Sequence, residues 1–315
     1  MEHLELVLAP MEGLTDFDMR QMLTTLSPYS WCVTEFLRVT QQLLPIKTFL
    51  RHMPELETAS KTLNGTPVHL QLLGSDPIAL AENAARAAEL GALAIDLNFG
   101  CPAKTVNKHR GGAALLQEPE LIYRIVTAVR AAVPSHTPVS AKIRLGINDD
   151  AELADNVAAI KQAGAAWLTI HARTKAQGYR PPVDWQAIAR AKQLAGAMKV
   201  IANGDVNSVD AARQCREVTR CNALMIGRAA VSQPGLVAQI ARDQPAMCWN
   251  DVRAAQLALL QRMVGQESGL LGRYKQWLAM TALHYPEAAI DFTLIKRHKR
   301  REEVLELMRS AGYIG

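Results

Sequence analysis

The stretch Ala94-Ile95-Asp96-Leu97-Asn98-Phe99-Gly100-Cys101-Pro102-Ala103-Lys104 joins an apolar run to an abrupt turn. Its first part has the composition of a buried strand, and Pro102 cannot extend that strand because proline lacks the backbone N–H that pairing requires. Cys101, between a glycine and a proline, is therefore expected at a strand end rather than in a core. Barrel enzymes carry their catalytic groups at strand ends.

Outward from this stretch, short β-branched runs alternate with Ala-rich helical stretches. The expected strands are Leu4–Ala9, Trp31–Glu35, Val68–Leu72, Ala94–Asn98, Val139–Arg144, Trp167–His171, Val200–Asn203 and Ala223–Gly227. The expected helices between them include Pro77–Leu90, Pro119–Ala132, Ala151–Ala163 and Val209–Glu217. Such alternation implies parallel pairing, and eight units predict a closed (β/α)8 TIM barrel. A doubly wound sheet is disfavoured because the first strand ends in Pro10-Met11-Glu12-Gly13, which lacks the G-x-G-x-x-G turn.

The alternation stops after a helix over Leu236–Arg242. We predict a catalytic barrel over residues 1–243 and a small, wholly helical domain over residues 244–315. The helical domain has 10 Lys and Arg against 7 Asp and Glu, so it is the basic part of a chain whose formal net charge is +5. Its expected helices are Asp251–Gly265, Arg273–His284, Asp291–His298 and Glu302–Arg309.

Composition narrows the class of protein. With 315 residues, 49% hydrophobic and 21% charged, the chain can bury a large core. Its five scattered cysteines form no C-x-x-C pair, which argues against a zinc site or a disulfide framework and for a reducing compartment. No secretory signal or bilayer-spanning run is evident, so a cytoplasmic location is expected and no membrane partner is.

Polar or glycine-bearing residues follow almost every expected strand, so they should converge on one rim of the barrel. The seventh and eighth strands end in Asn203-Gly204-Asp205 and Gly227-Arg228, which offer small residues and a guanidinium. Loops at these positions commonly hold phosphate in this fold, although turn glycines beside a surface arginine would look the same.

Three side chains carry the chemical hypotheses. Lys142, inside an apolar run, could form a Schiff base, act as a fixed cation opposite an electron-rich ring, or extend to solvent. His171 could donate to a cofactor, act as a general acid, or be a core imidazole. Cys101 is largely protonated at neutral pH, so it can serve as an acid, worth roughly 10²–10⁴-fold in rate. The alternative for Cys101 is a small apolar filler.

The helical tail combines cations with aromatic residues, an arrangement typical of RNA binding. A solvated helix face is the alternative reading of such a charge run. The residues expected to contact RNA are Arg273, Lys275, Gln276, Trp277, Lys296, Arg297, Lys299 and Arg300, with Arg38 and Lys104 on the barrel rim. The basic loop Asn107–Gly112 is interpreted as a further RNA-facing segment.

Together these motifs resemble those of the bacterial flavin-dependent tRNA-dihydrouridine synthases over essentially the full chain. The motifs that carry the resemblance are Ala9–Gly13, Gln71–Gly74, Asp96–Pro102, Lys142–Gly146, His171–Thr174, Ile201–Asp205 and Met225–Arg228. Thr34–Val39 and Arg273–Leu278 are similar to the C-type subgroup, which modifies uridine 16 in the D-loop.

The resemblance implies a mechanism in which NADPH reduces bound FMN, the flavin passes hydride to C6 of uracil, and Cys101 protonates C5. It implies that FMN is held by Pro10, Met11, Glu12, Gln71, Lys142, His171, Asn203, Gly204, Asp205, Gly227 and Arg228. It places the uridine against Asn98, Arg144 and Tyr179. The implied partner is tRNA, with no metal ion and no protein partner, and we expect a monomer.

Rival functions remain at this point. The same fold could house a flavin enzyme acting on a free small molecule such as a dihydropyrimidine, which would not need the basic tail. A Schiff-base lyase built on Lys142 would need no flavin. A non-catalytic RNA-binding protein would have no use for Lys142 and His171 inside apolar strands.

Overall fold

The computed structural model describes residues 4–108, 110–262 and 267–313. Its parallel strands form a closed barrel in sequence order, with β1 paired to β8 from Glu5 opposite Ala223 to Leu8 opposite Ile226. The strands are β1 Glu5–Leu8, β2 Trp31–Arg38, β3 Val68–Leu73, β4 Ile95–Phe99, β5 Val139–Arg144, β6 Trp167–His171, β7 Lys199–Asn203 and β8 Ala223–Ile226. The predicted TIM barrel is confirmed.

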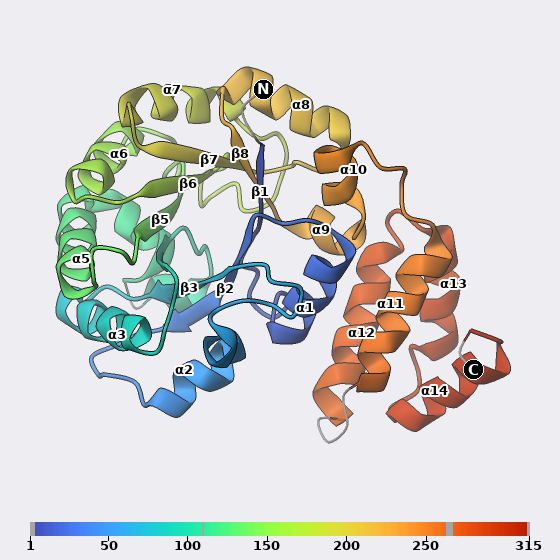
Figure 1. The fold of residues 1–315 in the computed structure, drawn as a ribbon. Coiled ribbons are helices and arrows are strands. Elements are labelled where there is room, and N and C mark those ends of the chain that lie inside the picture. Colours follow the sequence, from blue (N-terminus) through green and yellow to red (C-terminus); the bar gives the residue numbers. More distant parts are fainter. Residues whose placement is uncertain (1–3, 109, 263–266, 314–315) are drawn as a thin grey trace. The chain divides into compact units, whose positions relative to one another are not determined.

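Helices surround the ring of strands, as Figure 1 shows for α3, α5, α6, α7 and α8. The helices up to β8 are α1 Phe17–Leu26, α2 Ile46–His52, α3 Pro77–Glu89, α4 Lys104–Lys108, α5 Pro119–Ala132, α6 Leu153–Gln162, α7 Trp185–Ala195 and α8 Val209–Thr219, with short 3-10 turns η1 Pro54–Thr58 and η2 Gly112–Gln117. Several of them start at a side-chain cap. The Asp76 carboxylate accepts the N–H groups of Ile78 and Ala79 at 2.9 Å, and Ser208 Oγ accepts the Ala211 N–H at 3.0 Å.

The strand predictions are correct to within a few residues. The largest difference is β2, which continues past Glu35 to Arg38 and changes register against β3 between Val33 and Phe36. A bulge of this kind lets a strand bend and continue, and the sequence carries no glycine or proline there to signal it. Arg38 is therefore the last residue of β2.

The described chain forms two compact units. One contains the residues up to Arg20 together with Tyr29–Gly227, and the other contains Gln21–Pro28 with the described residues from Arg228 onward. Within the second unit Ser27 Oγ donates to the Pro234 carbonyl at 2.6 Å, which explains why the turn after α1 is grouped there. The division falls after Gly227, whereas the sequence placed it after residue 243. The assignment of catalysis to 1–243 and tRNA binding to 244–315 stays a prediction.

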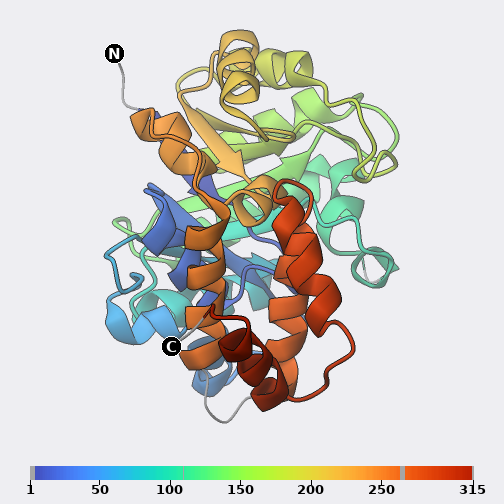
Figure 2. The same ribbon diagram turned by 90° about the vertical axis from the view of Figure 1, so that its right-hand side faces the viewer.

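The second unit is helical throughout its described elements. They are α9 Arg228–Ser232, α10 Leu236–Arg242, α11 Trp249–Arg262, α12 Glu267–Thr281, α13 Pro286–Ile295 and α14 Arg301–Ser310. Figure 2 shows the last four, orange to dark red, lying beside one another. Their buried core cluster includes Trp249, Leu260, Tyr274, Leu278 and Met308. The predicted helix start at Asp291 is wrong: α13 begins at Pro286, because proline is tolerated in the first turn of a helix. The predicted helix Asp251–Gly265 ends outside the described residues.

No helix among the described residues has both the length and the apolar composition needed to cross a bilayer.

Three aromatic rings lie together near the end of the barrel at which the strands begin. The His69 ring lies 5.5 Å from the ring of Trp31 and 5.5 Å from that of Trp167. Its Nδ1 is buried and has no hydrogen-bond partner among the described residues. Burial among these rings lowers the pKa of His69 to about 3. The imidazole is therefore neutral in the folded protein at neutral pH.

We predict that His69 makes the barrel sensitive to acid. An unfolded histidine has a pKa near 6.5, so between pH 6.5 and 3 the unfolded chain binds a proton that the folded chain does not. The free energy of unfolding should fall with decreasing pH in this window, by up to ~1.4 kcal/mol per pH unit from this group. Urea denaturation at several pH values should show a smaller change in the free energy of unfolding with pH for His69→Phe than for the wild type. The exposed His136→Gln is the control and should keep the wild-type slope.

Candidate active site

Cys101 lies in the turn that follows β4, with its side chain half-buried. Its carbonyl oxygen accepts the Ala113 N–H at 3.0 Å and Asn107 Nδ2 at 2.9 Å. Gly112, at φ +60°, is required beside it, because a Cβ there would lie 2.8 Å from the same carbonyl oxygen. The backbone of Cys101 is thus held by α4 and by η2, and the thiol lies at the end of the barrel at which the strands end.

Asn98 stabilises this turn through its side chain. Asn98 Oδ1 accepts the N–H groups of Gly100 at 3.0 Å and Cys101 at 2.9 Å. Its Nδ2 donates to Gln71 Oε1 at 2.8 Å. This role of Asn98 was not predicted from the sequence, which assigned Asn98 to the uridine, although asparagine side chains often bond to the backbone two residues on in turns. Contact with a base stays a prediction that would have to use the second N–H of the amide.

Arg144, the last residue of β5, connects the Cys101 turn with the loop after β6. Its Nε donates to the Gly100 carbonyl at 2.9 Å, and its Nη1 donates to the carbonyls of Gly178 at 2.9 Å and Thr174 at 3.1 Å. The guanidinium also lies 5.4 Å from the ring centroid of Tyr179, which is 57% exposed. The predicted uridine residues Arg144 and Tyr179 are therefore adjacent. Much of the Arg144 guanidinium is already engaged with backbone carbonyls.

Lys142 lies inside the barrel mouth, half-buried on β5. Its ammonium donates to Asn203 Oδ1 at 3.2 Å, and Asn203 Nδ2 in turn donates to the Met225 carbonyl at 2.8 Å. Burial, assisted by the positive charge of Arg144, lowers the pKa of Lys142 to about 8, while the carboxyl of Asp96 opposes the shift. At neutral pH the side chain therefore remains mainly a cation.

The predicted phosphate loop after β7 has the shape of a cradle. Gly204 has φ +123°, and a Cβ there would meet Ala172 Cβ and Val183 Cγ1 at 3.3 Å. Asp205, at φ +50°, binds the buried Arg173 by a bidentate ion pair with distances of 3.0 and 2.5 Å. Arg173 had no predicted role. Its guanidinium offsets the charge of the Asp205 carboxylate, which would otherwise repel an anion.

The remaining predicted cofactor residues of the barrel unit follow the ends of β1, β3, β6 and β8 or lie within these strands. Gly227 follows β8, and a Cβ there would lie 3.5 Å from Met11 Sδ, so the loop after β1 passes close to it. The Met11 N–H donates to Thr15 Oγ1 at 2.8 Å. His171, at the end of β6, meets the Tyr179 ring edge-on at 6.4 Å between ring centroids. Pro10 and Glu12 flank Met11, Gln71 is fully buried, and Arg228 is the exposed first residue of α9.

The thiol of Cys101 is in its protonated form at neutral pH. Burial raises its pKa, and the negative charge of Glu12 acts in the same direction. The Ala103 backbone N–H and the cations Arg144 and Lys142 oppose the shift. A protonated thiol held at the mouth of the barrel can donate a proton to a ligand there.

The predicted RNA contacts of the helical tail are only partly where the sequence placed them. Lys296, Arg297, Lys299 and Arg300 are exposed around the connection between α13 and α14, and Arg300 pairs with Glu303 at 2.6 Å. Lys275 is half-buried and donates to the carbonyls of Lys296 at 3.1 Å and His298 at 2.5 Å, so it holds this connection in place. Gln276 is exposed and accepts from Arg273 at 3.1 Å.

The prediction that Trp277 contacts RNA is wrong. Its side chain is fully buried, and its Nε1 donates to the Val231 carbonyl at 2.9 Å. Tyr274, on the same helix, is also buried at 1% exposure. A base cannot stack on either ring unless the helices separate. Both rings pack the interior of their own unit.

On the barrel rim, Arg38 and Lys104 are exposed at the ends of β2 and the start of α4. In the basic loop Asn107–Gly112, Lys108 and Arg110 are exposed, and Arg110 pairs with Glu118 at 2.8 Å. His109 lies outside the described residues.

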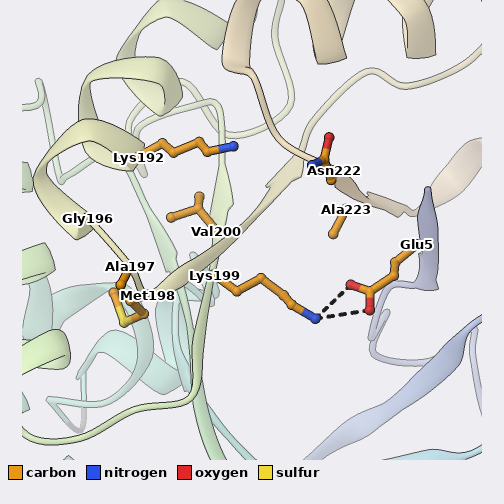
Figure 3. A pocket seen from close by; sticks show the side chains of 9 residues that line it. All are labelled: Glu5, Lys192, Gly196, Ala197, Met198, Lys199, Val200, Asn222 and Ala223. Atoms are coloured by element: carbon orange, nitrogen blue, oxygen red, sulfur yellow. Dashed lines mark hydrogen bonds and ion pairs between the residues drawn. The ribbon is translucent and has the colours of Figure 1, made fainter. Parts of the chain in front are cut away.

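A pocket of about 230 Å³ lies at the opposite end of the strands, at the beginnings of β1, β7 and β8. Figure 3 shows Lys199 and Glu5 facing each other there, with Lys199 Nζ at 2.8 and 3.0 Å from the two carboxylate oxygens. None of the predicted site residues lines this pocket. The predicted residues Cys101, Lys142 and Arg144 lie toward the opposite ends of the strands, and a site on that rim stays a prediction.

Comparisons with known proteins show what the whole chain is similar to. Residues 7–303 match the family described as dihydrouridine synthase (Dus). A tRNA-dihydrouridine(16) synthase of Pseudomonas putida is 48% identical over 305 residues, covering 93% of each chain. The protein of the same name from Escherichia coli is 47% identical over 300 residues, covering 93% of this chain and 94% of its own.

A solved structure of 2-naphthoyl-CoA reductase in complex with 2-naphthoyl-CoA has a similar fold, with a TM-score of 0.59 at 12% identity. The match covers 76% of this chain and 50% of that one, so it supports the fold alone.

Proposed function

The chain belongs to the dihydrouridine synthase family, and on that premise we propose how its residues reduce a uridine of tRNA to 5,6-dihydrouridine. The enzyme is an oxidoreductase that acts on the C5–C6 double bond of the uracil ring. We propose uridine 16 of the D-loop as the target, because the similar proteins are named for that position. The half-buried, protonated thiol of Cys101 at the barrel mouth is the observation that carries the mechanism.

The residues at the mouth fit a flavin mononucleotide. Lys142 supplies a cation inside the mouth, suited to an electron-rich ring system. The cradle of Gly204 and the small Gly227 leave backbone accessible for a phosphate, with Arg228 following in the chain. When bound, reduced FMN supplies the hydride that adds to C6 of uracil, and NADPH is the proposed source of those electrons.

Cys101 completes the reduction in this proposal. Hydride addition at C6 leaves negative charge shared between C5 and the C4 oxygen of the ring. The thiol proton passes to C5, the S–H bond breaks as the C5–H bond forms, and the thiolate regains a proton from solvent. Because burial keeps the thiol protonated at neutral pH, the acid is ready when the charge develops.

Lys142 acts as a fixed cation in this scheme and not as a Schiff-base former. A nucleophilic amine must be neutral, whereas a pKa of about 8 leaves Lys142 mainly charged at pH 7. Its hydrogen bond to Asn203 also fixes the direction of the ammonium. The proposed role is to favour negative charge on the reduced ring system.

The direct test uses the purified protein, FMN, NADPH and an unmodified tRNA transcript. We expect dihydrouridine at position 16, located by mass spectrometry of nuclease fragments. A transcript with cytidine at position 16 should remain unmodified. Product at another position would contradict the proposed target, and reduction of free uracil in preference to tRNA would favour the alternative of a small-molecule oxidoreductase.

We propose that the exposed basic residues around the connection between α13 and α14 bind the phosphates of tRNA. Replacing Lys296, Arg297 and Lys299 with glutamine should weaken tRNA binding and lower the slope of log affinity against log salt by about 2, since each phosphate contact contributes roughly 0.7–0.9. The control replaces three exposed cations of the barrel unit, Lys61, Lys161 and Arg213. An equal loss of slope in both variants would show that net charge, and not this surface, is responsible.

A further inference from the structure

A buried chain of hydrogen bonds leads from β5 to the Cys101 turn. Ser140 Oγ donates to Asp96 Oδ1 at 2.6 Å, and Gln71 Nε2 donates to Asp96 Oδ2 at 2.7 Å. Gln71 Oε1 accepts from Asn98 Nδ2 at 2.8 Å, and Asn98 Oδ1 accepts the N–H groups of Gly100 and Cys101. The four side chains come from the neighbouring strands β3, β4 and β5, and their exposure is between 0% and 8%.

The two ends of this chain determine the orientation of the amides between them. Backbone N–H groups at one end can only donate, so Asn98 must direct its oxygen toward the turn and its nitrogen toward Gln71. A carboxylate oxygen of Asp96 at the other end accepts, so Gln71 must direct its nitrogen toward Asp96. If either amide were flipped, two acceptors or two donors would face each other in a buried site, which costs free energy.

We propose that Asp96 is a positioning residue for Cys101, acting through the amides of Gln71 and Asn98. Asp96 does not touch the turn itself; it fixes the amide orientation that lets Asn98 accept the two backbone N–H groups. Ser140 in turn fixes Asp96. The inference rests on the proposed role of Cys101 as proton donor, and it gives two residues without an assigned function, Asp96 and Ser140, a part in that reaction.

Substitutions at Asp96 separate hydrogen-bond geometry from charge. Asparagine can direct its oxygen to Gln71 and its nitrogen to Ser140 Oγ, so Asp96→Asn should keep most of the activity. Asp96→Ala leaves Gln71 without its acceptor, so both amides become free to turn. We expect kcat to fall by about 10²-fold, as for a small misplacement of a reacting group, with KM for tRNA unchanged.

The second readout is the reactivity of the thiol, which does not depend on catalysis. In a Cys248→Ser background, which removes the exposed cysteine, iodoacetamide labelling of Cys101 is followed by peptide mass spectrometry. We expect Asp96→Ala to increase the labelling rate as the turn loosens, although kcat falls. Cys32 and Cys215 are buried and should stay unlabelled, which shows that the fold is intact. Labelling of Cys101 at the wild-type rate would overturn the proposal.

Two further variants complete the test. Ser140→Ala removes one of the two hydrogen bonds to Asp96 and changes little volume, so it serves if Asp96→Ala does not fold; we expect kcat to fall about tenfold. If Asp96→Asn is as impaired as Asp96→Ala, the carboxylate acts by charge and the positioning role is refuted. Cys101→Ala, measured in parallel, distinguishes the proton-donor role of Cys101 from the positioning role of Asp96. Full product formation by that variant would refute the proton donor, whereas the labelling rates would still test the turn.

Discussion

Replacing Cys101 with alanine is expected to lower the rate of dihydrouridine formation by about 10²–10⁴-fold while flavin remains bound. An effect of this size is expected for the loss of a general acid, because water must then supply the proton. Flavin binding should persist because the residues proposed to hold the flavin, which include Gly204, Gly227 and Lys142, do not include Cys101. Loss of the side chain also leaves the turn in place, since Asn98 and Ala113 hold the backbone and not the sulfur.

The measurement should isolate the chemical step. Enzyme carrying reduced flavin is mixed with excess tRNA, and flavin absorbance is followed as the uridine is reduced. Cys248→Ala is the matched control, because it removes an exposed cysteine of the helical unit. The Cys248 thiol donates to Asp251 of the same unit and belongs to no predicted site. We expect that control to react at the wild-type rate. A Cys101→Ala enzyme that reacts equally fast would exclude the thiol as the proton donor.

The pH dependence provides a further check on the same group. Burial raises the pKa of Cys101 above the ordinary thiol value of about 8.5, so the acid form persists through neutral pH. The single-turnover rate should therefore stay level through neutral pH and decline once the pH exceeds the thiol pKa. In Cys101→Ala this alkaline decline should disappear.

Much of the barrel follows from the sequence because strands and helices differ in the period of their apolar residues. The strands Val139–Arg144 and Trp167–His171 have the predicted bounds, since their apolar runs end in charged or aromatic polar residues. The extension of β2 to Arg38 depends on pairing with β3, which is not local in sequence. Likewise, the grouping of α9 with the C-terminal helices depends on contacts such as that of Trp277 with Val231.

The sequence predicts which residues share a rim of the barrel but not which of them are in contact. Sequence position placed Cys101, Lys142 and Asn203 on one rim, because parallel strands end at the same edge. It could not show that Asp205 pairs with Arg173, or that Arg144 binds the carbonyl of Gly100. These partners lie about 30 to 45 residues apart in the chain, and their meeting depends on strand register.

The burial of Trp277 could have been predicted from the spacing of its apolar neighbours in the sequence. Leu271, Tyr274 and Leu278 recur at the spacing of one helix face, and Trp277 lies beside that face. This pattern predicts an apolar stripe facing a core, whereas the neighbouring Arg273 and Lys275 suggested an RNA surface. Charged neighbours in sequence point to other sides of a helix, so adjacency to a cation does not indicate that an aromatic ring is exposed.

Replacing Trp277 with alanine is therefore expected to lower the free energy of unfolding by about 3–5 kcal/mol. The substitution leaves a cavity in the helical unit and removes the N–H that pairs with the Val231 carbonyl. Trp277→Phe keeps much of the apolar volume, so it should lose less, mainly from the unpaired carbonyl. The exposed Leu283→Ala, in the same unit, should be close to wild type.

Urea denaturation of the full chain measures these differences, and tRNA affinity is determined at a temperature where each variant is folded. We expect Trp277→Phe to bind tRNA with wild-type affinity, because a fully buried ring contributes no surface to the complex. Loss of the exposed cations Lys296, Arg297 and Lys299 should have the opposite profile, with weaker binding and unchanged stability. If Trp277→Ala were as stable as wild type and defective in tRNA binding, the ring would have to act at the surface, contrary to its burial and its hydrogen bond to Val231.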